Sequence, residues 1–205
     1  MKLVAELQPK GIALVAVSKF KTVADIQALY DLGQRDFGEN YVQELLEKEA
    51  QLPKDIRWHF IGHLQTNKVK FIAPFVHLIH GVDSIKLLKE ISKQGAKLGK
   101  QVPVLLQLHL AKEETKFGFD EAELAETLSL ASSFNGVEIK GLMGMASFSE
   151  DVELVRSEFR ILKHHFEANS NFEVLSMGMS SDYAIALEEG SNLLRIGSLL
   201  FGRRD

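Results

Sequence analysis

The stretch IALVAVSK (Ile12–Lys19) decides the fold of this chain. Its first six residues form a continuous apolar run, which is typical of a buried strand. The segment that follows, Val23–Leu32, places apolar residues three and four positions apart, the spacing of a helix with one buried face. A buried strand followed directly by an amphipathic helix indicates an α/β fold with a parallel sheet.

The same alternation continues to the end of the chain. The expected strands are Ile12–Val17, Asp36–Asn40, Arg57–Gly62, His77–Asp83, Val102–Leu110, Val137–Ala146, Glu173–Met179 and Leu193–Phe201. The expected helices are Val23–Leu32, Tyr41–Ala50, Asn67–Ile72, Ile85–Leu98, Glu121–Phe134, Val152–Ala168 and Tyr183–Glu189. About eight strands with right-handed crossovers predict a closed (β/α)8 TIM barrel, and a doubly wound open sheet is the alternative. The last strand has no helix after it, so the N-terminal segment is expected to take that place.

Composition limits the domain organisation and the partners. The chain is 45% hydrophobic and 25% charged, as in ordinary globular proteins, and it has no internal repeat or linker, so residues 1–205 are predicted to form a single domain. The net charge is −4 and the basic residues are scattered, which argues against nucleic-acid binding. The lack of cysteine excludes disulfides and thiolate metal sites.

The apolar runs stop at about ten residues, short of the ~20 that cross a bilayer. The apolar region at the start of the chain is too short for a signal peptide. We therefore expect a cytoplasmic protein without a membrane partner. The acidic, cysteine-free composition favours a monomer.

Lys19 is the first candidate functional residue, because the carboxyl ends of barrel strands carry the functional groups of this fold. Burial at a strand end would lower the pKa of its ammonium group, and only a neutral amine attacks an aldehyde. Starting from a pKa of about 10.4, a shift of about two units would raise the neutral fraction at pH 7 about a hundredfold. The alternative is an ordinary strand-end lysine that reaches solvent.

The ends of the last two strands are suited to a phosphate group. Ser180 stands between a glycine turn and a predicted helix, and Gly197 and Ser198 occupy the corresponding place after the last strand. Backbone N–H groups and hydroxyls at helix N-termini bind phosphate, and TIM barrels place phosphate sites after strands seven and eight. Arg195 shares the strand parity of Gly197 and should point inward, toward either a carboxylate such as Glu39 or a cofactor heteroatom. A capped helix that binds nothing is the simpler alternative.

Two further polar residues follow the second and third strands. Asn40 could pack on or hydrogen-bond a flat ligand, and His63 stands in a loop that could face a pocket, although capping or solvation would explain each of them alone. The other histidines form no metal-spaced set with carboxylates on one helix face, so no metal is predicted. Apart from His59 in the expected third strand, these are His77, His80, His109, His164 and His165.

Six segments in order resemble the pyridoxal phosphate homeostasis protein family, the YggS-like proteins related to the N-terminal barrel domain of alanine racemase. They are LVAVSK (Leu14–Lys19), FGENYVQE (Phe37–Glu44), WHFIGHLQTNK (Trp58–Lys68), KFGF (Lys116–Phe119), LSMGMSSDY (Leu175–Tyr183) and RIGSLLFG (Arg195–Gly202). The resemblance implies the barrel of fold-type III enzymes that use pyridoxal 5'-phosphate (PLP). It also implies that Lys19 holds PLP as a Schiff base, with the other cofactor-binding positions at Asn40, His63, Met177, Ser180, Arg195, Gly197 and Ser198. His63 departs from the residue expected of the family at its position.

Three functions remain open at this point. The resemblance favours a non-catalytic protein that stores, buffers or delivers PLP, with PLP-dependent apo-enzymes as its partners. An amino-acid racemase needs a second base on the opposite face of the substrate, which related racemases obtain from an added domain, and we expect no such domain in these 205 residues. A barrel that binds a sugar phosphate on its lysine would need a carboxylate beside that lysine, and Glu39 is the best candidate.

Overall fold

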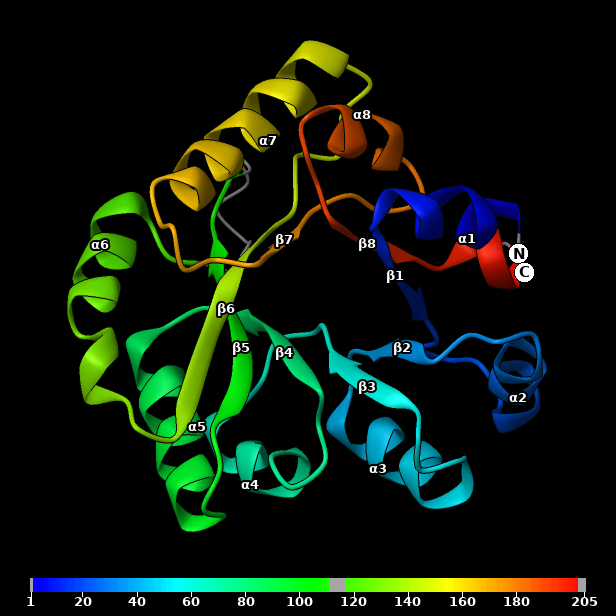
Figure 1. Ribbon diagram of the computed structural model, residues 1–205, viewed down its shortest axis with the longest axis horizontal. Helices are drawn as coiled ribbons and strands as arrows, with labels where there is room; N and C mark the ends of the chain where they lie inside the picture. Colours follow the sequence, from blue (N-terminus) through cyan, green and yellow to red (C-terminus); the bar gives the residue numbers. More distant parts are fainter. Residues whose placement is uncertain (1, 111–116, 203–205) are drawn as a thin grey trace.

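The computed structural model describes residues 2–110 and 117–202. Within these residues, eight parallel strands follow one another around a closed barrel in chain order, from β1 to β8 (Figure 1). β1 pairs with both β2 and β8, so the sheet has no free edge. The predicted TIM barrel is therefore confirmed, and the open sheet is excluded.

The element boundaries lie close to those expected from the sequence. The strands are β1 (Ala13–Val17), β2 (Asp36–Glu39), β3 (Arg57–Phe60), β4 (Leu78–Val82), β5 (Val102–Leu108), β6 (Val137–Gly144), β7 (Val174–Ser176) and β8 (Leu193–Ile196). The α-helices are α1 (Lys2–Leu7), α2 (Val23–Asp31), α3 (Val42–Gln51), α4 (Val69–Ile72), α5 (Ile85–Lys97), α6 (Glu121–Ser129), α7 (Val152–Glu167), α8 (Tyr183–Glu188) and α9 (Ser198–Phe201). Short 3₁₀ helices are η1 (Gln8–Lys10), η2 (Thr66–Lys68) and η3 (Ala131–Ser133).

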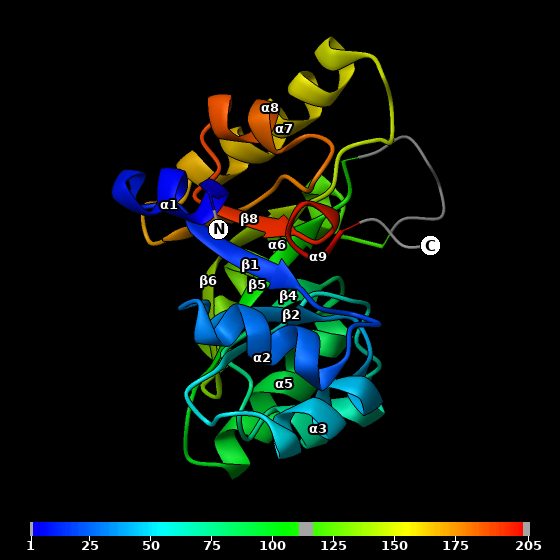
Figure 2. The ribbon, with the colours of Figure 1, turned by 90° about the vertical axis from the view of Figure 1, so that its right-hand side faces the viewer.

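The end of the chain differs from the expectation. β8 stops at Ile196, and Ser198–Phe201 forms the short helix α9 instead of continuing the strand. The expectation that the last strand lacks a helix was therefore wrong. Figure 2 shows α9 at the carboxyl ends of the strands and α1 toward their amino ends. α1 packs on the outside of the barrel beside β1, with Leu7 in the core between strands and helices, so the N-terminal segment does cover the barrel there (Figure 1).

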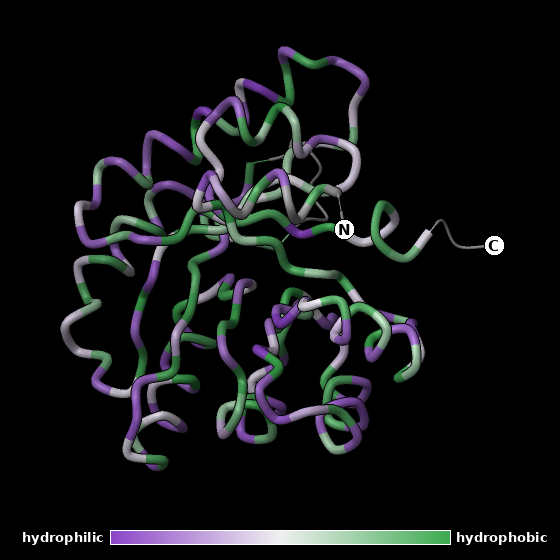
Figure 3. Tube along the Cα trace, turned by 45° about the vertical axis from the view of Figure 1, so that its right-hand side comes forward, coloured by the Kyte–Doolittle hydropathy of each residue, from purple (hydrophilic) through white to green (hydrophobic). Residues whose placement is uncertain are grey.

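Strand parity divides the apolar side chains between two cores. The larger core lies between the strands and the surrounding helices and includes Phe37, Trp58 and Leu175. A smaller cluster contains Val15 and Leu193, which alternate with residues of the larger core and therefore point into the barrel. The helices are hydrophobic on one face only, and Figure 3 shows hydrophilic and hydrophobic residues alternating along their coils. This alternation fixes which strand residues can reach a site inside the barrel.

In the described part of the chain, all helices are too short or too polar to span a bilayer.

Candidate functional site

A cavity of about 750 Å³ opens at the carboxyl ends of β1, β7 and β8. It gathers five of the residues predicted to bind the cofactor, which are Lys19, Ser180, Arg195, Gly197 and Ser198. Lys19 reaches this cavity because it shares strand parity with Val15 inside the barrel and with Val17 on the cavity wall. Lys19 and Ser198, which are 179 positions apart in the sequence (198 − 19), therefore meet at one mouth of the barrel.

The turn that carries Lys19 is held on both sides. The backbone N–H of Ser18 donates to the carbonyl of Gly38 at 2.9 Å, and the Ser18 carbonyl accepts from the Lys48 ammonium at 2.7 Å. Phe20 has a φ of +62°, a left-handed conformation that costs energy for a residue with a side chain. Its N–H donates to the Glu44 carboxylate at 2.5 Å. The lysine backbone is thus fixed before any ligand arrives.

Glu39 belongs to this support and not to the cavity. Its side chain is fully buried, and its Oε1 accepts from the Ser18 hydroxyl at 2.5 Å and from Lys48 at 2.7 Å. Burial raises the pKa of the Glu39 carboxyl above its ordinary value, although the hydrogen bonds from Lys48 and Ser18 oppose this shift. The expected pairing of Glu39 with Arg195 is wrong, because Glu39 shares the parity of Phe37 and points outward to α3.

Arg195 crosses the interior and is held by neutral oxygens. Its Nη1 donates to the side-chain oxygen of Ser176 at 2.6 Å and to the Ser176 carbonyl at 2.9 Å, while Nη2 donates to the Gly144 carbonyl at 3.1 Å. Only 4% of the residue is exposed. Burial lowers the pKa of the guanidinium to about 10, with the Asp182 carboxylate opposing the shift, so it remains charged at neutral pH. It is a fixed positive charge at the cavity floor.

The side of the cavity formed by β7 and β8 combines hydroxyl and backbone groups. The Ser180 hydroxyl accepts from the Gly197 N–H at 3.3 Å, and α9 begins at the next residue. Lys21 also lines the cavity, a position that the sequence analysis missed because it considered only Lys19 after the first strand. Backbone geometry and packing, rather than ligand approach, explain why position 178 is a glycine. The φ of Gly178 is +96°, and an added Cβ would lie 2.6 Å from the Ala186 Cβ.

The remaining three predicted residues lie outside the wall of this cavity. Met177 is fully buried in the core between barrel and helices, so its side chain does not reach the cavity. His63 stacks on Phe117 with ring centroids 4.0 Å apart and contacts the Asp83 carboxylate at 2.7 Å. Asn40 follows β2 at the same end of the barrel, and its backbone lies against Gly62, where an added Cβ would be 2.4 Å from the Asn40 carbonyl oxygen. Lys116 of the KFGF segment lies outside the described residues.

Comparison with known proteins identifies the family. The model of the alanine racemase N-terminal domain family matches residues 2–205. A protein of Aquifex aeolicus named pyridoxal phosphate homeostasis protein is 41% identical over 197 residues, which cover 93% of this chain and 86% of the relative. The chain belongs to the pyridoxal phosphate homeostasis protein family. A relative of the same name in Schizosaccharomyces pombe is 37% identical, over 95% of this chain and 85% of its own length.

Solved structures agree with this assignment. The structure of PipY of Synechococcus elongatus with PLP bound is 34% identical, with a TM-score of 0.89 over 98% of this chain and 99% of PipY. PipY without PLP gives a TM-score of 0.91 at 35% identity, over 98% of this chain and 97% of PipY. Alanine racemase from Bartonella henselae shares the fold at 20% identity, with a TM-score of 0.81, over 99% of this chain and 61% of the racemase.

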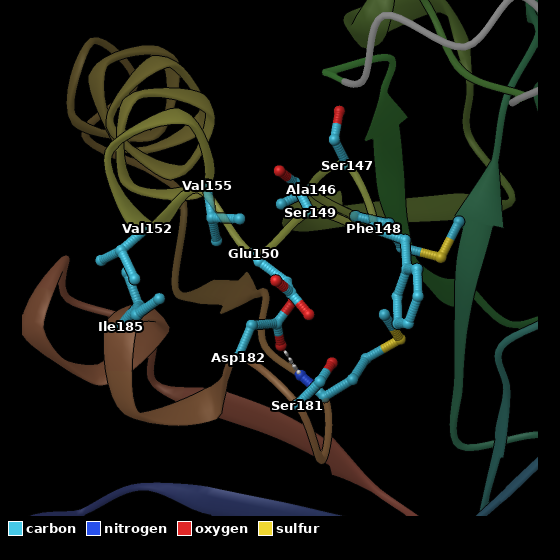
Figure 4. A pocket seen from close by; sticks show the side chains of 12 residues that line it. Ala146, Ser147, Phe148, Ser149, Glu150, Val152, Val155, Ser181, Asp182 and Ile185 are labelled. Carbon is cyan, nitrogen blue, oxygen red and sulfur yellow. Dashed lines mark hydrogen bonds between the residues drawn. The ribbon is translucent and has the colours of Figure 1, made fainter.

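In the present chain, a second cavity of about 630 Å³ adjoins the first and shares Phe148, Met179 and Ser181 with it. Figure 4 shows apolar and polar side chains converging from the loop after β6, from α7, and from α8 with the turn before it. The loop is anchored by the buried Glu158, which accepts from the Ser147 N–H at 2.6 Å and from its hydroxyl at 2.7 Å.

A polar chain continues from Arg195 through the barrel interior of this family member. Ser176 Oγ lies 3.1 Å from His80 Nδ1, and His80 Nε2 lies 2.9 Å from His59 Nδ1. His59 Nε2 lies 3.0 Å from the carboxylate of Asp36, at the amino ends of the strands. Burial lowers the pKa of His80 well below its usual range, which keeps the ring neutral. The chain therefore joins the cavity floor to the opposite mouth of the barrel.

Proposed function

We propose that this chain binds PLP in the cavity at Lys19 and serves PLP homeostasis by storing, buffering or delivering the cofactor. The observation that supports this best is the convergence of one lysine, one buried arginine and a serine–glycine rim in a single cavity of about 750 Å³. That volume suits a small cofactor, since small-molecule sites measure about 300–1,000 Å³. The PLP-bound structure of a relative adds support.

The residues present fit an anionic aromatic ligand. Lys19, Lys21 and Arg195 bring three basic side chains to the cavity, which complements the charge of a phosphate ester. The Asn40 amide oxygen is buried and accepts no hydrogen bond from the described residues, but Asn40 lies outside the wall of this cavity. The fit to an anionic group therefore rests on the three basic side chains.

The proposed roles are those that the resemblance to the family implies for these positions. Lys19 is the amine that would form the Schiff base, and Ser180 with the Gly197–Ser198 backbone would bind the phosphate. Arg195 would face the pyridine nitrogen, where its permanent charge disfavours protonation of that nitrogen. PLP supplies an electron sink when bound, and an unprotonated ring weakens that sink.

The Schiff base is tested with the variant Lys19→Ala and the matched control Lys10→Ala, a surface lysine in η1. Reduction with borohydride followed by peptide mass spectrometry should place the cofactor mass on Lys19 alone. The visible absorbance of the PLP-loaded protein should disappear in Lys19→Ala and persist in Lys10→Ala. Absorbance retained in Lys19→Ala, or cofactor mass on another lysine, would contradict the assignment.

Cofactor handling and racemisation are separated by α-hydrogen exchange. The tyrosines of this chain, Tyr30, Tyr41 and Tyr183, lie on helices or directly beside them. We therefore expect PLP-loaded protein in deuterated water to leave L- and D-amino acids unexchanged, and to transfer PLP to a PLP-dependent apo-enzyme. Exchange at enzymatic rates would favour the racemase. A cytoplasmic monomer is part of the proposal, and size-exclusion chromatography tests its oligomeric state.

A further inference from the structure

A second cluster of ligand-type side chains lies at the amino ends of the strands, opposite the cofactor cavity. Asp36 opens β2, His59 is on β3 and His77 directly precedes β4. One ligand atom from each of the three lies within 4.8 Å of the others. The sequence analysis predicted no metal because it looked for donors on one helix face, whereas these come from three neighbouring strands.

From this geometry we propose that Asp36, His59 and His77 form a binding site for a zinc-type divalent cation. A tetrahedral ion with bonds of about 2.1 Å holds its ligand atoms about 3.4 Å apart. His59 Nε2 and the Asp36 carboxylate already lie 3.0 Å apart. His77 is exposed, so its ring can close the remaining distance by side-chain rotation, and water would fill the fourth position.

The surroundings of His59 provide independent support. Metal-binding imidazoles use their second nitrogen in a hydrogen bond that fixes ring orientation and tautomer. His59 is buried, and its Nδ1 lies 2.9 Å from His80 Nε2. With the metal on Nε2, the His59 proton sits on Nδ1 and is donated to His80. His80 Nδ1 lies 3.1 Å from Ser176 Oγ, which fixes His80. The hydrogen bond to His80 therefore holds the orientation of the His59 ring.

The donor set selects the class of ion. Two imidazoles and one carboxylate suit Zn²⁺, Co²⁺, Ni²⁺ or Cu²⁺, whereas Mg²⁺ and Ca²⁺ prefer oxygen ligands throughout. Arg57 competes with the ion, because its guanidinium donates to both Asp36 oxygens, at 2.7 and 2.5 Å. The arginine side chain is 49% exposed and can turn into solvent. Removing its charge should therefore tighten metal binding.

The test is a titration of the tag-free full chain with ZnCl₂ by calorimetry and with Co²⁺ by visible absorbance. We expect one ion per chain, at least tenfold weaker binding in His77→Ala, and tighter binding in Arg57→Gln. His164→Ala is the matched control, because exposed His164 lies beside His165 in a second histidine pair, and it should bind as the wild type does.

Three results would overturn the proposal. They are the absence of stoichiometric binding in the wild type, unchanged binding in His77→Ala, or equal losses in His77→Ala and His164→Ala. The first of these would leave the cluster as an ion-pair network of Arg57, Asp36 and His59. Because all titrations use protein without PLP, their outcome is independent of the proposed cofactor site.

Discussion

Replacing Lys48 by methionine should expose how much the turn of Lys19 depends on a buried ion pair. Lys48 donates to Glu39 at 2.7 Å, to Glu44 at 2.6 Å and to the Ser18 carbonyl at 2.7 Å. The Lys48 side chain is 6% exposed and that of Glu39 is fully buried. Methionine fills a similar volume, so the substitution removes the charge and leaves the packing nearly intact.

The expected loss of stability depends on how the buried Glu39 carboxylate responds once Lys48 is gone. Breaking a buried pair by removing one partner costs about 3–5 kcal/mol. Glu39 can escape by taking up a proton, which at pH 7 costs about 3.4 kcal/mol for a pKa of 4.5 and less for a higher pKa. With the bonds to Ser18 and Glu44 also lost, we expect about 3–5 kcal/mol at pH 7.

The pH dependence has a definite sign. Without Lys48, the folded-state pKa of Glu39 rises further above its unfolded value, so the stability of the variant is highest below that unfolded value and falls as the pH rises. The loss relative to wild type should therefore shrink by up to about 2.7 kcal/mol between pH 7 and pH 5.

Urea denaturation at both pH values measures these losses. Lys54→Met is the control, because Lys54 also pairs with a glutamate, Glu49, at 2.7 Å but is 68% exposed. An exposed pair contributes about 0–1 kcal/mol, with little change between pH 5 and 7. A Lys48→Met loss no larger than that of the control, or one that is the same at both pH values, would refute the reasoning.

Two further substitutions test the frame around the cavity. Glu158→Ala leaves the Ser147 N–H and hydroxyl without their buried acceptor. It should lower the free energy of unfolding by about 2–3 kcal/mol in urea titrations. An unchanged midpoint would mean that other contacts hold the loop after β6. Gly62→Ala places a Cβ 2.4 Å from the Asn40 carbonyl oxygen, so we expect about 1–3 kcal/mol of destabilisation by thermal unfolding, and a wild-type melting temperature would show that the β3 turn can yield there.

The order of strands and helices was predictable because apolar runs and helical spacing alternate from end to end. The end of β8 was not, because LLRIGSLLF is apolar on both sides of Gly197 and periodicity cannot tell a strand from a helix in such a short run. The backbone bends at Gly197, where α9 begins. A glycine followed by a serine was the available signal, and it was used only to predict a phosphate contact.

The positions of site residues were predicted correctly where strand parity was applied. They were predicted wrongly where it was not. Parity placed Arg195 correctly inside the barrel, and the same reasoning applied to β2 would have placed Glu39 outside, with Phe37. Met177 follows Ser176, which faces inward, so Met177 faces the helices. The donors of the proposed metal site could not be found from spacing, because their proximity depends on the register of three strands.

The chain of polar side chains through the barrel links the hydrogen bonding of Arg195 to that of Asp36 at the opposite mouth. Arg195 can only donate, so the Ser176 oxygen accepts from it, and the Ser176 hydroxyl hydrogen is available to His80 Nδ1. If that hydrogen is donated to His80, then His80 donates from Nε2 to His59 and His59 donates from Nε2 to Asp36, so every hydrogen bond runs from buried Arg195 toward the partly buried Asp36. A metal ion on His59 Nε2 would displace that last proton and reverse both imidazole tautomers. Ser176 would then accept from His80 as well as from Arg195, so occupancy at one mouth of the barrel would change the hydrogen bonding of the arginine at the other.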